Sequence, residues 1–213
     1  MSGIILYDYF RSSAAYRVRI ALNLKGLAYE ARPVNLLESE QKSDDYRALN
    51  PQGLVPMLAI DGQRLTQSIA IIAYLEQRNP KPPLLPREPA DAAHVRAMAF
   101  TIACDIHPLN NLRVLKYLKN ELGASQDEVD AWYAHWIREG LTPLEAMASP
   151  RAGDFLFGDT PTIADVCLVP QLYNARRFEV PIEDFPTLLR AEENANRMEA
   201  FAAAHPDRQG MAA

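Results

Sequence analysis

Residues 4–26 read IILYDYFRSSAAYRVRIALNLKG, and this stretch predicts a β-strand followed by an α-helix. The run from Ile4 to Tyr9 is apolar and rich in strand-forming residues. From Ala14 to Lys25 apolar residues recur at helical spacing, and Gly26 stands where a glycine commonly ends a helix. The polar residues 11–13 therefore mark the boundary between a strand and the helix that follows it.

The chain up to residue 80 continues this alternation of strands and helices. The further predicted elements are a strand at 29–34, a helix at 38–49, strands at 55–60 and 64–66, and a helix at 68–78. Asp61-Gly62 predicts a tight hairpin turn between the last two strands. The order βαβ, α, ββα indicates a thioredoxin-like α/β domain over residues 1–80.

A proline-rich segment separates this domain from an all-helical remainder. The stretch NPKPPLLP at 79–86 contains four prolines, which remove backbone donors and restrict their neighbours. We interpret residues 81–88 as a linker and residues 89–213 as an all-α C-terminal helical bundle that binds substrate. The predicted helices of the bundle are residues 90–121, 126–148, 162–176 and 188–204.

Thr162 followed by Asp165 predicts the start of one of these helices. A threonine hydroxyl at this place accepts from a backbone amide of the first turn and stabilises the helix by about 1 kcal/mol. We expect both residues to be structural.

Composition excludes several classes of function. The net charge of −5 gives no basic surplus for nucleic acid. Charges interrupt every apolar stretch before the roughly 18 to 20 residues that cross a bilayer. The first residues lack a basic and apolar signal segment, so we expect a cytoplasmic protein without membrane or nucleic-acid partners.

The cysteines and histidines predict no metal or redox centre. Cys104 and Cys167 match no redox or zinc spacing, and we expect two buried, reduced thiols. The four histidines include no pair at metal-binding helical spacing. The catalytic groups must then be hydroxyls, arginines and a bound cofactor, and no metal is expected.

A set of motifs occurs in order along nearly the whole chain. The stretches are Tyr9 to Leu22, Ala48 to Pro56, Gln67 to Ile72, Asp105 to Asn111, and Gly158-Asp159 followed by Ala175 to Phe178. Together they resemble the motifs of the zeta class of glutathione transferases, which includes the maleylacetoacetate isomerases. The resemblance implies the glutathione-transferase fold, glutathione as cofactor and a homodimer. It also implies isomerisation of maleylacetoacetate to fumarylacetoacetate in tyrosine and phenylalanine catabolism.

Ser12 is the residue that the resemblance places against the glutathione sulfur. A hydroxyl at a helix N-terminus favours an anion. Lowering a thiol pKa from about 8.5 to about 6.5 requires about 2.7 kcal/mol. One charge-assisted hydroxyl bond of about 1.5 to 3 kcal/mol, together with a helix end, could supply this. Ala14 departs from the family, which usually has cysteine there, so any role of a protein thiol at that position is absent.

The resemblance implies further contacts to the cofactor. Val55-Pro56 occupies the place of a cis-proline that leaves the preceding backbone open to glutathione, although the sequence does not reveal the isomer. For His107, a structural histidine is the competing interpretation. The other predicted glutathione contacts are Ser13, Gln41, Gln67, Ser68 and Asn111.

Arginines are expected to hold a dicarboxylate keto-acid substrate. Addition of a thiolate to a cis alkene makes an enolate beside carboxylates, which fixed cations stabilise. Arg11, Arg113 and Arg177 are the predicted substrate contacts, with Ser12, Arg11 and Arg177 as the catalytic set. Arg17 and Arg19 are expected instead to form structural ion pairs.

Three alternatives remain open. Maleylpyruvate isomerase of gentisate catabolism uses a similar substrate and the same chemistry. A general glutathione transferase acting on α-halo acids would consume glutathione and release a conjugate. A non-enzymatic adaptor with a thioredoxin fold would have lost glutathione, and the retention of Ser12, Gln67 and Ser68 argues against it.

Overall fold

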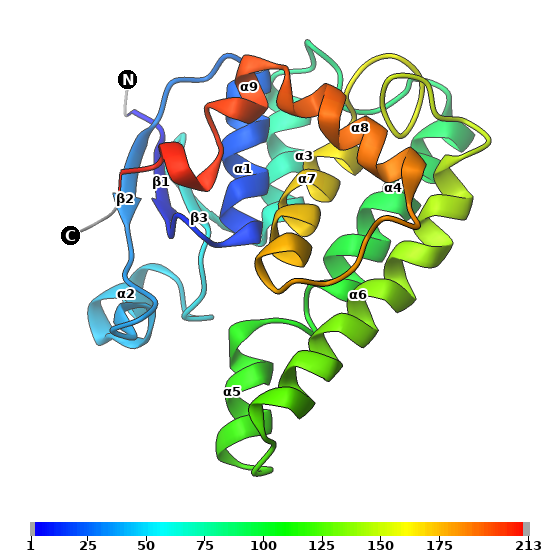
Figure 1. The fold of residues 1–213 in the computed structure, drawn as a ribbon. Coiled ribbons are helices and arrows are strands. Elements are labelled where there is room, and N and C mark those ends of the chain that lie inside the picture. The colour runs from blue at the N-terminus through cyan, green and yellow to red at the C-terminus, as the bar shows by residue number, and fades with distance from the viewer. Residues whose placement is uncertain (1–2, 211–213) are drawn as a thin grey trace. The chain divides into compact units, whose positions relative to one another are not determined.

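The computed structural model describes residues 3–210, and residue contacts divide the chain into two compact units (Figure 1). Unit 1 combines the chain up to Pro83 with the segment from Arg197 onward, and unit 2 is Leu84–Asn196. Within residues 3–210, no helix has both the length and the apolar character needed to cross a membrane.

Unit 1 is built on a mixed four-stranded sheet in the order β2-β1-β3-β4. Its strands are β1 (Ile5–Asp8), β2 (Glu30–Pro33), β3 (Met57–Ile60) and β4 (Gln63–Thr66). β1 pairs parallel with β2 and antiparallel with β3, where the buried Leu6 lies opposite the buried Leu58. A parallel pair needs a crossover connection, and α1 (Ser13–Leu24) provides it.

Helices cover this sheet and complete its core. α1 lies beside α3 (Ser68–Arg78), as Figure 1 shows, and Ala15, Val18 and Leu22 of α1 are fully buried. A 3₁₀ turn at Glu40–Lys42 and α2 (Asp44–Leu49) fill the region predicted as one helix. The interruption occurs because Ser43 is extended and caps α2.

Positive φ angles confirm the two predicted turns of unit 1. Asp61 and Gly62 have φ of 51° and 75° and join β3 to β4 as a hairpin. Gly26, with φ of 64°, follows the end of α1.

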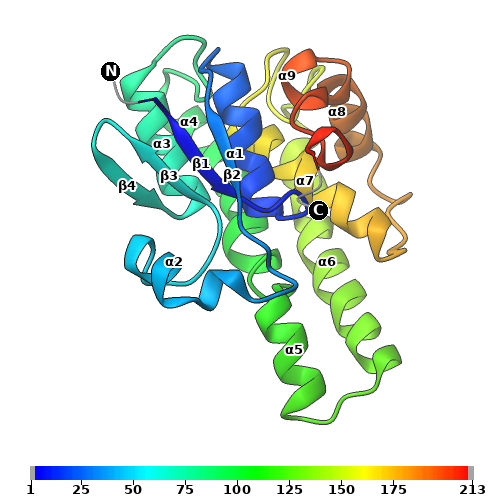
Figure 2. The same cartoon turned by 90° about the vertical axis from the view of Figure 1, so that its left-hand side faces the viewer.

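The segment after residue 197 packs on α1. It contains α9 (Glu199–Ala202) and a 3₁₀ turn at Pro206–Arg208. Figure 2 draws α9 next to α1, and the Asn23 amide donates to the Ala200 carbonyl at 2.9 Å. The predicted helical domain, residues 89–213, therefore extends further along the chain than the contact-defined unit 2.

Unit 2 is a helical bundle arranged around one buried helix. Its helices are α4 (Pro89–Phe100), a π-helical turn (Thr101–Ile106), α5 (Leu112–Asn120), α6 (Gln126–Ala148), α7 (Ile163–Arg177) and α8 (Pro186–Asn196). α7 contacts both α4 and α8, and every residue from Ile163 to Leu172 is buried. α6 has the bounds that the sequence predicts.

The predicted helix at residues 90–121 is wrong in its middle. The chain leaves α-helical geometry after Phe100 and turns at residues 107–111 before α5 begins. Pro108 cannot donate within a continuing helix. Gly140 on α6 also lets Ile106 approach, because a Cβ at Gly140 would lie 2.2 Å from Cγ1 of Ile106. A contact between helices thus fixes a break that local spacing does not reveal.

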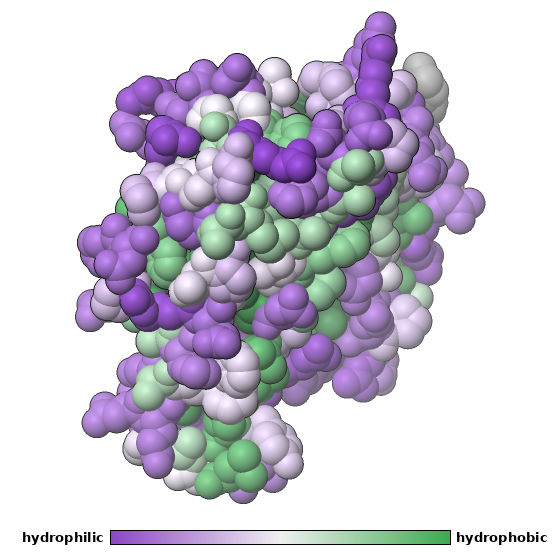
Figure 3. Space-filling model, turned by 90° about the vertical axis from the view of Figure 1, so that its right-hand side faces the viewer, coloured by the Kyte–Doolittle hydropathy of each residue, from purple (hydrophilic) through white to green (hydrophobic). Residues whose placement is uncertain are grey.

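α5 exposes most of its side chains. Only Leu115 of this helix is buried, while Leu112 and Tyr117 are among the exposed large apolar residues. Figure 3 shows apolar side chains at the bottom of the view, where α5 and the start of α6 lie. Arg113 is likewise exposed to solvent.

Candidate functional site

Ser12 forms the N-cap of α1 and keeps its hydroxyl proton available. Its Oγ accepts from the Ala15 amide at 3.3 Å, and its carbonyl accepts from the Tyr16 amide at 2.8 Å. Its own amide donates to the Tyr9 carbonyl at 2.8 Å. Among residues 3–210, no group accepts the Ser12 hydroxyl proton. α1 also has no acidic residue in its first turn, so its N-terminal dipole is free to attract an anion.

The neighbours of Ser12 differ in exposure. Ser13 is buried, whereas Arg11 is exposed with its guanidinium 4.9 Å from the centre of the Phe10 ring. In the part of the chain that the structure describes, Arg11 forms no ion pair. It is therefore a cation next to Ser12 that is not neutralised by a side chain.

Gln41 and the loop before Pro56 lie together. A Cβ at Gly53, where φ is +59°, would stand 2.9 Å from the Gln41 carbonyl oxygen, so glycine permits this close approach. Gln41 is buried, and its Oε1 has no hydrogen-bond partner within residues 3–210. The Val55-Pro56 peptide bond is cis. Neither backbone polar group of Val55 bonds to any other described residue.

α3 begins without a side-chain cap. Gln67, with φ of 68°, uses its amide nitrogen to reach Oε1 of Gln52 at 3.0 Å rather than capping the helix. Ser68 is buried and accepts from Nη1 of Arg17 at 3.4 Å. Amides at an uncapped helix start form a ready anion site.

In unit 2, Asn111 has a structural contact. Its side chain caps α5 by accepting from the Arg113 amide at 3.1 Å. The His107 amide donates to the Ile102 carbonyl at 2.9 Å, which closes the π-helical turn. The predicted residues His107, Asn111 and Arg113 therefore lie close together along the chain, between the end of the π-helical turn and the start of α5.

Arg176 and Arg177 are neighbours with opposite roles. Arg176 forms two hydrogen bonds of 2.5 Å with the carboxylate of the buried Glu192. Arg177 forms no ion pair within residues 3–210, and its guanidinium lies 5.0 Å from the centre of the Phe178 ring. Of the two, Arg177 is the one available to a ligand.

Tyr133 lies near Arg177, and Asn110 bonds to Tyr133, although neither residue was selected from the sequence. Tyr133 stacks on Phe178 at 3.8 Å, and burial raises its pKa while the nearby Arg177 opposes that rise. The Asn110 amide donates to the Tyr133 carbonyl at 3.1 Å, and its buried Oδ1 has no described partner. Asn110 lies inside the motif at residues 105–111, so the sequence could have identified it. Tyr133 lies outside the motifs, and only its tertiary contacts reveal its place in the site.

The predicted site residues therefore form two groups. The groups are Ser12, Arg11, Ser13, Gln41, Val55, Pro56, Gln67 and Ser68 in unit 1, and His107, Asn111, Arg113 and Arg177 in unit 2. Within residues 3–210, no cluster of three histidine, cysteine or acidic residues is placed to hold a metal ion.

Comparison with known proteins identifies the family. Residues 6–83 match the family described as glutathione S-transferase, N-terminal domain, and residues 126–201 match its C-terminal domain. A probable maleylacetoacetate isomerase of Vibrio cholerae is 47% identical over 98% of both chains. A holo structure of maleylpyruvate isomerase, described as a bacterial glutathione S-transferase in zeta class, has a TM-score of 0.96 and 44% identity, covering 98% of this chain and 100% of its own.

The chain belongs to the zeta class of glutathione transferases. The family and fold predicted from the sequence are thereby confirmed. Another relative of known structure, maleylacetoacetate isomerase from Anaeromyxobacter dehalogenans, has a TM-score of 0.88 and 44% identity, covering 99% of this chain and 98% of its own. Its structure holds dicarboxyethyl glutathione and citrate in the active site.

Proposed function

We propose that this zeta-class protein catalyses the glutathione-dependent cis–trans isomerisation of a maleyl keto acid, with maleylacetoacetate as substrate. The observation that carries the proposal is the open N-terminus of α1. There the Ser12 hydroxyl accepts from Ala15 and retains its own proton for a ligand. A hydroxyl that accepts from a backbone amide is a better donor to a thiolate, because hydrogen bonds in a chain polarise one another.

The residues of unit 1 fit glutathione. The uncapped start of α3 at Gln67 and Ser68 suits a carboxylate. The unpaired backbone of Val55 suits the extended peptide part of the cofactor, and Oε1 of Gln41 is a buried acceptor that needs a donor. The bound thiolate would supply a nucleophile that adds to the cis double bond and later leaves, which permits rotation.

Ser12 would hold the sulfur as an anion. Its hydroxyl lies at the N-terminus of α1, where the helix dipole favours negative charge. The first turn of α1 contains no carboxylate that would compete with the sulfur.

The unpaired arginines would bind the carboxylates of the substrate. Arg11, Arg113 and Arg177 form no ion pair within the described residues, whereas Arg176 is occupied by Glu192. A guanidinium presents a planar fork that matches a carboxylate. Such cations also stabilise the negative charge that develops on the keto acid during addition.

Maleylpyruvate is the second candidate substrate, because the zeta-class relative of TM-score 0.96 is a maleylpyruvate isomerase. Both substrates are dicarboxylate keto acids with a cis double bond, and the same residues would serve either. The homodimer and the cytoplasmic location stay predictions.

The test follows both substrates separately by absorbance, with catalytic glutathione, without it, and with S-methylglutathione, whose sulfur is blocked. We expect turnover only with free glutathione, which should be recovered unchanged, and a higher kcat/KM for maleylacetoacetate. A higher value for maleylpyruvate would select the second substrate. Stoichiometric loss of glutathione on an α-halo acid, without isomerisation of either compound, would replace the proposal with a conjugating transferase.

A further inference from the structure

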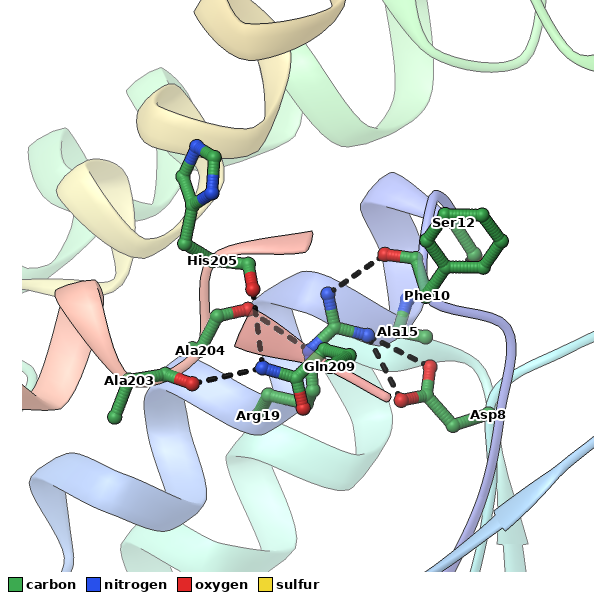
Figure 4. Close-up of polar contacts among 9 residues, drawn as sticks. All are labelled: Asp8, Phe10, Ser12, Ala15, Arg19, Ala203, Ala204, His205 and Gln209. Atoms are coloured by element: carbon green, nitrogen blue, oxygen red, sulfur yellow. Dashed lines mark hydrogen bonds and ion pairs between the residues drawn. The ribbon is translucent and has the colours of Figure 1, made fainter. Parts of the chain in front are cut away.

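The side chain of Arg19 joins three separate segments of unit 1 (Figure 4). It has no solvent exposure, and its Nη1 lies 2.8 Å from both carboxylate oxygens of Asp8. Nη2 donates to the Phe10 carbonyl at 3.0 Å, and Nε donates to the Ala204 carbonyl at 3.0 Å. One guanidinium thus holds the end of β1, the turn that follows it and the C-terminal segment.

Helix geometry explains why Arg19 reaches this turn. Arg19 follows Ser12 by seven residues, which is about two helical turns, so both lie on one side of α1. Long side chains on a helix lean toward its N-terminus. Arg19 therefore points back along α1 to the carbonyl of Phe10, two residues before Ser12.

The turn from Asp8 to Ser12 is then held by several bonds. Arg19 binds the Asp8 carboxylate and the Phe10 carbonyl, while the Tyr9 carbonyl accepts from the Ser12 amide at 2.8 Å. Few backbone torsions of this turn can change without breaking one of these bonds. The direction of the Ser12 hydroxyl depends on the same torsions.

The C-terminal end of this network is itself braced. The Gln209 amide donates to the carbonyls of Ala203 and His205, at 2.7 and 3.1 Å, on either side of Ala204 (Figure 4). Tyr16 of α1 meets the His205 ring edge to face at 6.2 Å. The carbonyl that Arg19 binds therefore belongs to an ordered turn.

A buried ion pair is a costly way to stabilise a fold. Apolar residues of similar volume often stabilise a protein as well or better. Burial raises the pKa of Asp8, and Arg19 acts against that rise, which shows the desolvation cost of the pair. What apolar residues could not supply is directed hydrogen bonding to two carbonyls and one carboxylate.

We propose that Arg19 is a positioning residue, whose guanidinium fixes the turn that carries Ser12 and makes the C-terminal segment part of that support. This inference rests on the proposed function, in which the Ser12 hydroxyl donates to the glutathione sulfur. Arg19 itself would touch neither glutathione nor substrate.

The test compares Arg19→Lys and Arg19→Met with the wild type. Lysine keeps a cation for Asp8 but lacks the fork that also reaches Phe10 and Ala204. We expect both variants to lose about tenfold in kcat, because a misplaced catalytic hydroxyl loses part of its effect. The pKa of the bound glutathione thiol, followed by thiolate absorbance, should rise in both, with a smaller change in KM for glutathione.

Lys25→Met is the matched control. The Lys25 side chain is equally buried at the end of the same helix, and it binds Glu76 and the Pro82 carbonyl at 2.5 Å each, away from Ser12. We expect it to lower the melting temperature while leaving kcat and the thiol pKa unchanged. If the Arg19 variants behave like this control, Arg19 only stabilises the fold and the proposal is wrong.

The test still decides if Arg19→Met fails to fold or if the proposed function is wrong. Should Arg19→Met not fold, Arg19→Lys still decides, because its retained charge supports the Asp8 carboxylate. Amide hydrogen exchange at residues 12–16 reports the turn without any turnover, and faster exchange is expected in Arg19→Lys but not in Lys25→Met. A wild type without isomerase activity would therefore refute the proposed function while the exchange result still tests the role of Arg19.

Discussion

Two helices of this protein start with the same kind of cap but in different states. Ser12 begins α1 and Thr162 begins α7, and each hydroxyl accepts from a backbone amide, at 3.3 and 3.2 Å. At α7 the Asp165 carboxylate takes both the amide and the hydroxyl proton of Thr162, at 2.8 and 2.9 Å. At α1 no described group takes the hydroxyl proton. A closed cap stabilises the fold, whereas an open cap leaves its proton for a ligand.

Breaking the closed cap should have the largest effect, and on stability alone. Asp165→Ala leaves the buried amides of Leu156 and Thr162 without their acceptor, at a cost of about 1 to 3 kcal/mol each. We expect the free energy of unfolding, measured in urea, to fall by about 4 kcal/mol, with kcat per folded molecule unchanged. A loss of less than about 1 kcal/mol would contradict a closed structural cap.

The same contrast distinguishes the two adjacent arginines. Arg177→Ala should remove a bidentate contact to substrate worth about 3 kcal/mol, which is roughly a hundredfold in kcat/KM. Glutathione binding should be unaffected. Arg176→Ala is the matched control and should reduce stability, because it leaves the buried Glu192 unpaired, with little effect on kcat/KM. Unchanged kinetics in Arg177→Ala would remove this residue from the mechanism.

The closed cap should also make stability depend on pH. Burial raises the pKa of Asp165 from 3.8 to about 6, and bonds from Leu156 and Thr162 only partly oppose this. As pH rises, the unfolded state therefore releases its proton first, so stability falls between about pH 4 and pH 6, by at most about 3 kcal/mol. This contribution should be absent from Asp165→Asn. If the wild type and Asp165→Asn show the same dependence of unfolding free energy on pH, Asp165 makes no such contribution.

Breaking the open cap should have a smaller effect, expressed in catalysis. Ser12→Ala removes one hydrogen bond to a thiolate, worth about 2 kcal/mol, so kcat should fall about thirtyfold. Unfolding should change by only about 1 kcal/mol. Thr162→Ala supplies the comparison, since it also removes a cap hydroxyl but should leave kcat unchanged. Equal kinetic losses in the two variants would show that Ser12 acts only through the fold.

Local patterns in the sequence were sufficient where the determinants are local. The hairpin at Asp61-Gly62 and the bounds of α6 follow from turn chemistry and apolar spacing. The cap at Thr162 follows from the spacing to Asp165. These features depend on neighbours a few residues away, which a single sequence displays.

Features set by distant contacts were not predictable. The break after α4 depends on Gly140 of another helix meeting Ile106. The sequence predicted a structural ion pair for Arg19, and the pair with Asp8 confirms it. The hydrogen bond from Arg19 to the Ala204 carbonyl was not predictable, because the two residues are 185 positions apart. Likewise, only the contact with Glu192 shows that Arg176 is occupied.

The discontinuity of unit 1 has a consequence for synthesis of the chain on the ribosome. Arg19 and Asn23 bind carbonyls of the segment that begins at Arg197, and that segment is translated only after the whole of unit 2. N-terminal domains often fold while translation continues. Here the guanidinium of Arg19 lacks one of its acceptors until Ala204 has emerged, so the Ser12 turn should reach its final form late in synthesis.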